Sequence, residues 1–247
     1  MFEVHQSHGD FREASCEVPV KTWIFDPPYN VGYQYGEKVN DSMNRLEYLD
    51  FIGDAGEKMW DMSEPDANLF YINYQEQCAR TFPILESKGW VLKQWITWVY
   101  PSNIGMSKRK CTRASRGVLW FTKGNPEAFM DATVQPYRNP NDKRVKAQIA
   151  KGKKGTHHYD WWSINLRKNV SKGFAGYYNQ LPAELVERCI LLSTSEGDVV
   201  GDLMAGSGSH IRPSVLNGRI PYMNDIDDSA PGLWHDVIIE TWKEMVE

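Results

Sequence analysis

The chain has 247 residues, of which 41% are hydrophobic and 24% charged, values that are typical of one globular domain and exclude a wholly disordered or collagen-like protein. No run of about 18 apolar residues occurs, so we expect no membrane span. The four cysteines lie far apart without a CxxC spacing, and the first residues lack the apolar segment of a signal peptide. We therefore expect no disulfide framework, no zinc ribbon and a cytoplasmic location.

The net charge of −4 hides an uneven distribution of charged residues along the chain. Residues 101–172 hold 16 Lys and Arg against 4 Asp and Glu, so the remainder is strongly acidic. Within this basic segment, aromatic residues and glycines are interleaved with the lysines, as in KGKKGTHHYDWW at residues 151–162. Such a combination is typical of nucleic-acid-binding surfaces, whereas a run of charge alone is more often a solvated face. Both interpretations stay open at this point.

Predicted strands and helices alternate along the first half of the chain. Residues 22–25 form a short apolar strand that ends at Asp26, because the two prolines that follow prevent a helix or a central strand. Residues 31–44 are polar and contain glycine, which predicts a mobile loop. The pattern then predicts helices at residues 46–60 and 75–88, and strands at residues 68–72, 90–99 and 117–121.

The last part of the chain repeats this alternation. Residues 182–194 predict a helix with proline at its start, and residues 198–202 predict a strand. A glycine-bearing loop, a helix and a strand at 220–225 follow, and we expect Pro221 to interrupt that strand. Alternating strands and helices indicate a mostly parallel sheet covered on both faces, which binds ligands at the carboxyl ends of its strands. The residues that follow the predicted strands are therefore candidate site residues.

The glycine-bearing loop has the pattern of an adenosine site. Gly206 and Gly208 precede a helix, and the acidic residue Asp225 follows Gly206 by nineteen positions at the end of the next strand. Glycines let a ligand approach the backbone, a helix N-terminus favours an anion, and the acid binds ribose hydroxyls. Gly-x-Gly alone also occurs in ordinary tight turns. The full GxGxxG spacing is missing, so S-adenosylmethionine fits better than a dinucleotide with its pyrophosphate.

The Asp-Pro-Pro-Tyr motif at residues 26–29 has a structural and a chemical explanation. Asp and Pro are common in polar turns after strands. In the chemical explanation, the Asp26 carboxylate and the Pro27 carbonyl accept hydrogen bonds from an exocyclic amino group, whose conjugated lone pair is otherwise a poor nucleophile. Neither proline has an N–H that could compete for these acceptors, and the Tyr29 ring offers a face on which a base can stack.

Together these residues resemble the amino-methylating DNA methyltransferases of the β arrangement, in which Asp-Pro-Pro-Tyr precedes the cofactor loop. The resemblance covers nearly the whole chain and rests on the combination of motifs, since each motif alone is unspecific. The similar segments are Gly9-Asp10, residues 26–30, the strand motifs at 69–72 and 95–98, LWFTKG at 119–124, DWWSI at 160–164, NQLPAEL at 179–185, DLMAGSGS at 202–209, and Asp225 at the position of the family's ribose acid.

The resemblance implies an α/β fold of three layers (αβα, Rossmann-like), with a seven-stranded, mostly parallel sheet that contains one antiparallel strand. It implies a single methyltransferase domain over residues 1–247, with a basic insertion at about 101–172 that contacts DNA and recognises the target. The implied reaction transfers a methyl group from S-adenosylmethionine to the exocyclic amino group of a base flipped out of double-stranded DNA. Asp26 favours adenine N6, because the cytosine N4 enzymes of this group usually carry Ser there. Cytosine N4 methylation is the nearest alternative.

The resemblance also assigns roles to individual residues. The chain departs from the family pattern with Leu181 in place of Lys and with Leu203 and Met204 in place of Pro and Phe. We expect these departures to affect the affinity for the cofactor more than the type of reaction. The expected catalytic residues are Asp26, Pro27, Pro28 and Tyr29; the expected cofactor-binding residues are Asp10, Asp26, Asn179, Gln180, Leu181, Asp202, Met204, Ala205, Gly206, Ser207, Gly208, Asp225 and Ile226; and the expected nucleic-acid-binding residues are Lys108, Arg109, Lys110, Arg113, Lys143, Arg144, Lys151, Lys153 and Lys154.

Other functions have less support from the sequence. The adjacent His157 and His158 face different directions and lack a Cys or carboxylate cluster, so we expect no metal site. A nicotinamide-dependent oxidoreductase would use the glycine loop but gives no reason for the Asp-Pro-Pro-Tyr motif. A DNA-binding module without catalysis is disfavoured by the intact Asp26, Tyr29 and Asp225. The expected partners are double-stranded DNA, with RNA left open, and a restriction enzyme where one accompanies the chain, which would be a monomer or a homodimer.

Overall fold

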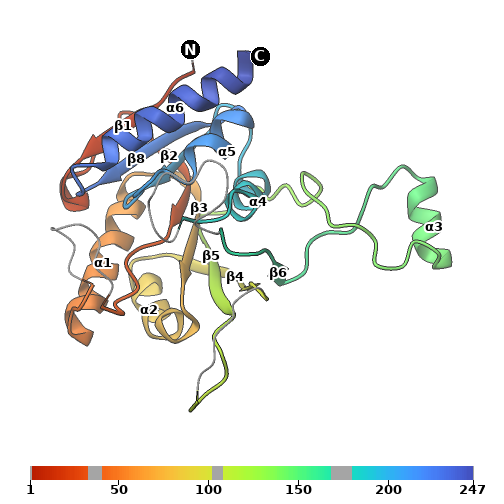
Figure 1. The fold of residues 1–247 in the computed structure, drawn as a ribbon, viewed down its shortest axis with the longest axis horizontal. Coiled ribbons are helices and arrows are strands. Elements are labelled where there is room, and N and C mark those ends of the chain that lie inside the picture. Colours follow the sequence, from red (N-terminus) through yellow and green to blue (C-terminus); the bar gives the residue numbers. More distant parts are fainter. Residues whose placement is uncertain (1, 33–40, 102–107, 168–179, 247) are drawn as a thin grey trace.

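A twisted sheet with helices on both faces forms the body of the protein (Figure 1). The computed structural model describes residues 2–32, 41–101, 108–167 and 180–246. Within these ranges the sheet has eight strands in the order β1-β8-β7-β2-β3-β5-β4-β6, and β5 is antiparallel to both neighbours while the other pairs are parallel. The strands are β1 (His5–His8), β2 (Val20–Phe25), β3 (Ser63–Asn73), β4 (Val91–Val99), β5 (Ser115–Lys123), β6 (Trp161–Ser163), β7 (Val199–Asp202) and β8 (Ile220–Asp225).

Side chains of the central strands alternate between two buried layers. Trp23 and Phe25 of β2 pack into the cluster that contains α1, whereas Ile24 packs into the cluster on the opposite face, which contains α4. A third cluster joins α5 and α6. None of the helices in the described ranges combines the length and the apolar character that crossing a bilayer requires. The helices are the 3-10 turn η1 (Phe11–Glu13), α1 (Arg45–Asp61), α2 (Gln75–Ser87), α3 (Lys143–Ala150), α4 (Ala183–Ser193), α5 (Ile211–Leu216) and α6 (Ala230–Val246).

The expected three-layer fold with a single antiparallel strand in the described sheet is confirmed, but that sheet has eight strands instead of seven. Both edge strands escape a sequence-based prediction because they are short. β6 has three residues, with only Trp162 buried, and pairs with the end of β4. β1 has four residues, none of them fully buried. Neither segment is long enough to show the apolar alternation that predicts a strand.

The prediction that Pro221 interrupts the last strand is wrong. β8 runs through Pro221, which lies opposite Val200 of β7. On its other side β8 pairs with β1 only from Tyr222 onward. Pro221 is therefore the second residue of the strand and precedes the β1 ladder, a position where the missing N–H is tolerated.

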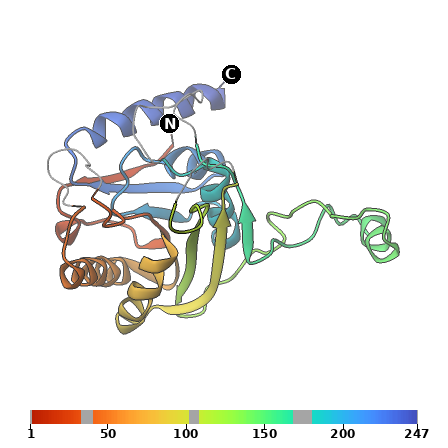
Figure 2. The same ribbon diagram turned by 60° about the horizontal axis from the view of Figure 1, so that its bottom comes forward.

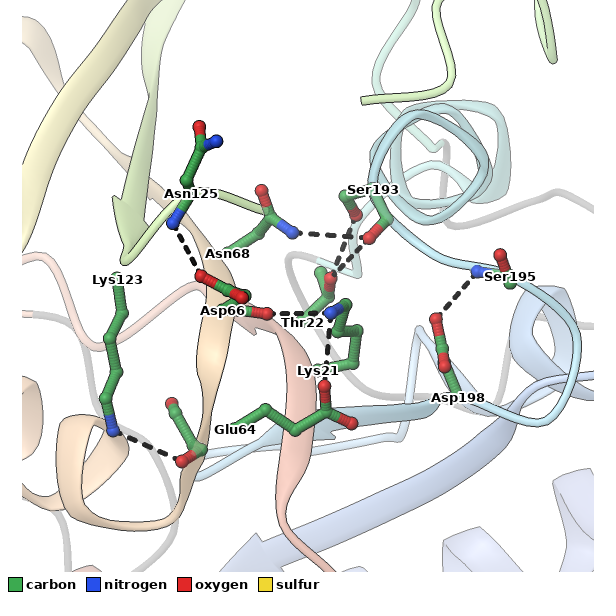
Figure 3. A network of polar contacts seen from close by, with 11 residues as sticks. Lys21, Thr22, Glu64, Asp66, Asn68, Lys123, Asn125, Ser193, Ser195 and Asp198 are labelled. Carbon is green, nitrogen blue, oxygen red and sulfur yellow. Dashed lines mark hydrogen bonds and ion pairs between the residues drawn. The ribbon is translucent and has the colours of Figure 1, made fainter. Parts of the chain in front are cut away.

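Polar side chains connect β2 and β3 to the end of α4, away from the strands' carboxyl ends (Figure 3). The buried hydroxyls of Thr22 and Ser193 lie 3.0 Å apart, and the Asn68 amide donates to the Ser193 carbonyl at 3.2 Å. At the rim, the Lys21 ammonium lies 3.1 Å from a Glu64 carboxylate oxygen. The contacts of Ser193 with Thr22 and Asn68 satisfy polar groups that would otherwise be buried without partners, and they fix the end of α4 on the sheet.

Residues 131–160, here called the arm, extend away from the body between β5 and β6 and carry α3 at their far end (Figures 1 and 2). Gln135 and Thr156 form an isolated antiparallel bridge between its two sides. No residue of α3 is buried. The basic segment expected as one insertion at 101–172 therefore includes a core strand, because residues 118–121 of β5 are fully buried in the sheet.

Candidate active site

A cavity of about 550 Å³ lies at the carboxyl ends of β2, β7 and β8. It brings together the Asp-Pro-Pro-Tyr motif after β2, the glycine loop after β7 and Asp225 at the end of β8, with Asp10 from the turn after β1. The volume falls in the range of cofactor sites, about 300–1,000 Å³. Residues more than two hundred positions apart in the sequence, such as Asp10 and Asp225, thus share one wall, as expected for the carboxyl edge of a parallel sheet.

Most residues predicted to bind the cofactor line this cavity. Gly208 does not: a side chain there would collide with Ile211, so its role is close packing of the loop on α5. Asn179 lies outside the described residues. The cavity is also lined by ten residues that were not predicted to bind the cofactor: Gly9, Phe11, Arg12, Met43, Glu47, Asp50, Phe51, Leu203, Ser209 and Asn224. The predicted residues in the lining are Asp10, Asp26, Gln180, Leu181, Asp202, Met204, Ala205, Gly206, Ser207, Asp225 and Ile226.

The glycine loop is held by backbone and carboxylate contacts. Gly206 and Gly208 have φ angles of 50° and 73°, a left-handed conformation that glycine adopts without strain. The Gly206 N–H donates to Asp225 at 2.7 Å, and the Gly206 carbonyl accepts from the Trp234 indole at 2.9 Å. Leu181, which replaces the family's lysine, is 4% exposed and belongs to the apolar cluster that contains α4.

The acidic groups of the cavity lie close enough to affect one another. Asp202 is buried, and its pKa lies well above the ordinary value because of burial, with further increases from the charges of Asp26 and Asp225. The backbone N–H of Met204 donates to Asp202 at 3.0 Å and opposes this shift. Burial also raises the pKa of Asp225. The cavity therefore favours a ligand that carries positive charge.

S-adenosylmethionine fits this lining by its chemistry. Its ammonium and sulfonium groups are positive, which suits a wall of carboxylates, and its ribose hydroxyls suit an acid such as Asp225 at a strand end. Gly206 has no side chain to block the loop backbone that faces the cavity. Asp10 caps η1 through the Arg12 N–H at 2.9 Å, which orients its carboxylate at the rim.

The Asp-Pro-Pro-Tyr motif is fixed by hydrogen bonds from three separate elements. Tyr48 of α1 donates to the Pro28 carbonyl at 2.8 Å, and Gln77 of α2 donates to the Tyr29 carbonyl at 3.0 Å. Arg116 of β5 donates from Nη1 to the Tyr29 hydroxyl at 2.8 Å. With its backbone carbonyls held from behind, the motif presents Asp26 to the cavity in one orientation.

Asp26 is the acidic residue of this motif and lines the cavity. Its carboxylate Oδ1 accepts a hydrogen bond from the Tyr29 hydroxyl. Burial raises the pKa of Asp26 to about 6, although the charge of Arg116 and the hydrogen bond from Tyr29 act in the opposite direction. Near neutral pH the group is thus mostly ionised, and its pKa is close enough to neutral for it to exchange a proton.

Three residues that hold the motif were not found from the sequence. Tyr48, Gln77 and Arg116 are 20, 48 and 87 positions from the residues that they contact. One signal could have identified Arg116, since it is a charged residue in the apolar strand segment 115–123. The loop predicted at residues 31–44 lies partly outside the described residues, although Asp41 accepts hydrogen bonds from the N–H groups of Asn30 and Val31 at 2.7 and 3.1 Å.

The residues predicted to bind nucleic acid occupy two separate places. One group lies on the connection between β4 and β5. There the Arg113 guanidinium lies 3.8 Å from the Tyr74 ring centroid and pairs with Glu76 at 3.0 Å. The other group lies on the arm, at α3 and just beyond it, where Lys153 pairs with Asp131 at 3.1 Å (Figure 1). The first group is Lys108, Arg109, Lys110 and Arg113, and the second is Lys143, Arg144, Lys151, Lys153 and Lys154; all except the partly exposed Arg113 are exposed.

The sequence of the chain is similar to those of known DNA methyltransferases. A family model described as DNA methylase, covering N6 and N4 methyltransferases, matches residues 20–229. The chain is similar to the Type II methyltransferase M.HpaI of Haemophilus parainfluenzae, with 31% identity over 193 residues, which cover 75% of this chain but only 57% of that protein. It is 27% identical over 230 residues to M1.MboII of Moraxella bovis, covering 85% of this chain and 86% of that protein.

Solved structures share the fold at low sequence identity. The PvuII DNA methyltransferase, described as cytosine-N4-specific, matches with a TM-score of 0.70 at 16% identity, over 94% of this chain and 85% of that chain. M1.HpyAVI in complex with SAM matches with a TM-score of 0.61 at 16% identity, over 93% and 96%. Both matches support the Rossmann-like arrangement of the sheet.

Proposed function

The chain belongs to the DNA methylase family of N6 and N4 amino-methylating enzymes, and from this membership we propose that it methylates the N6 amino group of adenine in double-stranded DNA. The family's methyl donor is S-adenosylmethionine. The family match also removes the basis for a nicotinamide-dependent oxidoreductase. Adenine is proposed because Asp26 stands at the first position of the motif, where the resembling cytosine N4 enzymes usually carry Ser.

One observation carries the proposal: Asp26 lines the same cavity as the glycine loop and Asp225. A carboxylate that accepts hydrogen bonds and a candidate adenosine site therefore border a single space. Within the described residues Asp26 accepts one hydrogen bond, from Tyr29 to Oδ1, which leaves Oδ2 for a substrate amino group. This combination is what transfer between a bound cofactor and a base requires.

The proposed chemistry uses Asp26 and Pro27 as acceptors. When bound, S-adenosylmethionine supplies an electrophilic methyl group. The two acceptors draw electron density toward the amino nitrogen and favour its tetrahedral form. As the nitrogen gains a bond it must release a proton, and Asp26, with a pKa of about 6, can accept it. Asp225, the Gly206 backbone and Asp10 would hold the cofactor.

The DNA must reach this cavity with its target base outside the helix, at a cost of a few kcal/mol for unpairing and unstacking. We propose that the exposed lysines and arginines of the arm and of the β4–β5 connection neutralise phosphates. The proposed setting is the cytoplasm, with the chain as a monomer or homodimer and with a restriction enzyme as a partner where one is present.

Cytosine N4 methylation is the second candidate, because the PvuII enzyme with the same fold is described as cytosine-N4-specific. Expression in a host without DNA methylation, followed by mass spectrometry of the digested nucleosides, separates the two. We expect N6-methyladenine in host DNA and none with the Asp26→Ala variant. N4-methylcytosine would replace the proposal with the second candidate. No modified base, despite binding of both DNA and S-adenosylhomocysteine, would indicate a catalytically inactive module.

A further inference from the structure

Arg116 is a buried cation behind the Asp-Pro-Pro-Tyr motif. The residue is only 6% exposed. Aromatic faces attract cations, so an aromatic enclosure stabilises a charge that burial otherwise penalises. The guanidinium carbon lies 4.8 Å from the ring centroid of Tyr29, 5.1 Å from that of Trp98, 5.6 Å from that of Tyr74 and 5.8 Å from that of Tyr100.

The polar contacts of Arg116 are with tyrosine hydroxyls, those of Tyr29 and Tyr100. Within the described ranges it forms no ion pair, and its Nε has no hydrogen-bond partner. Its Nη1 donates to the Tyr29 hydroxyl at 2.8 Å. Burial lowers the pKa of Arg116, but its electrostatic interactions with Tyr29, Asp26, Tyr100 and Tyr74 outweigh burial and raise this pKa above its ordinary value. A buried cation without a carboxylate partner is costly, so the position of Arg116 calls for an explanation by function.

The donor chemistry of Arg116 fixes the direction of the next hydrogen bond. A guanidinium has only N–H donors, so the Tyr29 oxygen must accept from it. The single hydroxyl hydrogen of Tyr29 is then directed to its other neighbour, Oδ1 of Asp26. The two hydrogen bonds point the same way, from the cation to the carboxylate, and each polarises the other.

We propose that Arg116 is a positioning residue which, through the Tyr29 hydroxyl, holds Oδ1 of Asp26 and keeps this carboxylate ionised, so that Oδ2 is free to accept from the substrate amino group. This inference rests on the proposed function, in which Asp26 accepts a hydrogen bond from the target base.

The charges around Asp26 support the same role. Burial raises its pKa to about 6, and Arg116 and Tyr29 oppose that rise. The neighbouring Asp202 has a pKa well above its ordinary value because of burial, and the charge of Asp26 contributes to that shift. Tyr74 and Tyr100 face the guanidinium. Without the cation, the effect of burial would be opposed by the Tyr29 hydroxyl alone, so the pKa of Asp26 would rise further and less of it would be ionised near neutral pH.

The test compares Arg116→Met, Arg116→Lys and Tyr29→Phe with the wild type. Lys93→Met is the matched control, because Lys93 also places its charge over an aromatic ring, 4.3 Å from the Trp120 centroid, and that ring is not part of the Asp-Pro-Pro-Tyr motif. The pKa of Asp26 is measured by ¹³C NMR of labelled aspartate carboxyls, assigned with Asp26→Asn. This readout does not require DNA methylation. The pH profile of kcat, the KM for DNA and the affinity for S-adenosylhomocysteine are measured in parallel.

In Arg116→Met we expect the pKa of Asp26 and the acidic limb of kcat to move upward by about one pH unit or more. We expect kcat to fall by about tenfold or more at neutral pH, with KM and cofactor affinity within about threefold. Tyr29→Phe should move the pKa in the same direction. Arg116→Lys should show a smaller upward shift of the Asp26 pKa than Arg116→Met, and Lys93→Met should behave as wild type.

An unchanged Asp26 pKa in a folded Arg116→Met protein would overturn the proposal, since a packing role alone lowers stability without moving this titration. If Arg116→Met fails to fold, the pKa of Asp26 is measured in Tyr29→Phe instead. An unchanged pKa in that variant would overturn the proposal that Arg116 acts on Asp26 through the Tyr29 hydroxyl. A wild type that binds DNA and cofactor but methylates no base would contradict the proposed function instead, and the NMR titration would still decide the role of Arg116.

Discussion

The Asp225 carboxylate accepts a hydrogen bond from the backbone N–H of Gly206 at 2.7 Å, which joins the end of β8 to the loop that follows β7. Its other oxygen accepts from the Asp227 N–H at 2.9 Å. The side chain also lines the cavity. One carboxylate thus orders the glycine loop and faces the space proposed for the cofactor.

Asp225→Ala should therefore weaken binding of S-adenosylhomocysteine by about tenfold or more, since hydrogen bonds to a charged group contribute about 1.5–3 kcal/mol each. Isothermal titration calorimetry measures this, and DNA affinity without cofactor should stay near the wild-type value. Asp225→Asn keeps an acceptor for Gly206 but removes the charge, so it separates loop order from charge. Equal cofactor affinity in the alanine variant and the wild type would reject the ribose assignment.

Asp26→Ala should abolish detectable methylation while affinities for DNA and cofactor stay within a few-fold of wild type, because Asp26 acts mainly in the transition state. Single-turnover methylation checks the predicted loss of activity, and equilibrium binding, measured side by side, checks the unchanged affinities. A variant that methylates near the wild-type rate would exclude Asp26 as the acceptor of the amino hydrogen bond.

Tyr29 should show a graded loss. Its ring is in edge contact with Tyr74 at 4.8 Å, and its hydroxyl lies between Asp26 and Arg116. Sequence reasoning assigns Tyr29 a stacking role through its ring, worth about 1–3 kcal/mol. The structure adds a role for the hydroxyl. Tyr29→Phe should therefore reduce kcat, and Tyr29→Ala should reduce it further. Equal damage from both substitutions would leave no part for the ring.

DNA affinity should fall steeply with salt although the protein is acidic overall. If about five phosphates are neutralised, log K against log[salt] should have a slope of about −4 to −5. Replacing Lys151, Lys153 and Lys154 of the arm with Glu should flatten the slope, whereas Lys243→Glu on α6 should not. Fluorescence anisotropy over a salt series measures the slope for each variant. An unchanged slope in the triple variant would place the DNA away from the arm.

Stability should depend on His210 at mildly acidic pH. This histidine is fully buried, its Nε2 lies 3.0 Å from the Tyr222 carbonyl, and burial lowers its pKa from 6.5 to about 4. The unfolded chain therefore takes up the proton first, so the contribution is complete above about pH 6.5 and is lost as the pH falls toward 4, up to about 3 kcal/mol.

Urea unfolding of the wild type and His210→Gln between pH 7.5 and 4.5 checks this. The difference between the two proteins should shrink as the pH falls. Asp26 acts with the opposite sign, because its raised pKa makes stability fall as the pH rises toward 6. Since Asp26 is common to both proteins, the comparison isolates His210. A difference that does not change with pH would assign His210 a packing role only.

The sequence predicted the core strands and the cavity wall because both depend on local signals. Apolar runs such as residues 22–25 and 198–202 are followed by prolines or glycines, and parallel strands bring those endings to one edge. Arg116 was missed because its partner, Tyr29, is 87 positions away. α3 was missed because none of its residues is buried, which leaves no apolar periodicity to detect.

The reversed direction of β5 has a consequence for the placement of its two ends. Gly117 pairs with Asn73, the last residue of β3, whereas Lys123 pairs with Ala67, six positions earlier along that strand. The start of β5 therefore lies at the edge of the sheet where β2 and β3 end, and Arg116 reaches the motif after β2 from there. The chain leaves the opposite end of β5 toward the arm, but after the arm it returns in β6, where Trp162 lies opposite Trp98, the residue of β4 that also lies opposite Arg116. The returning side of the arm therefore joins the sheet two strands away from Arg116.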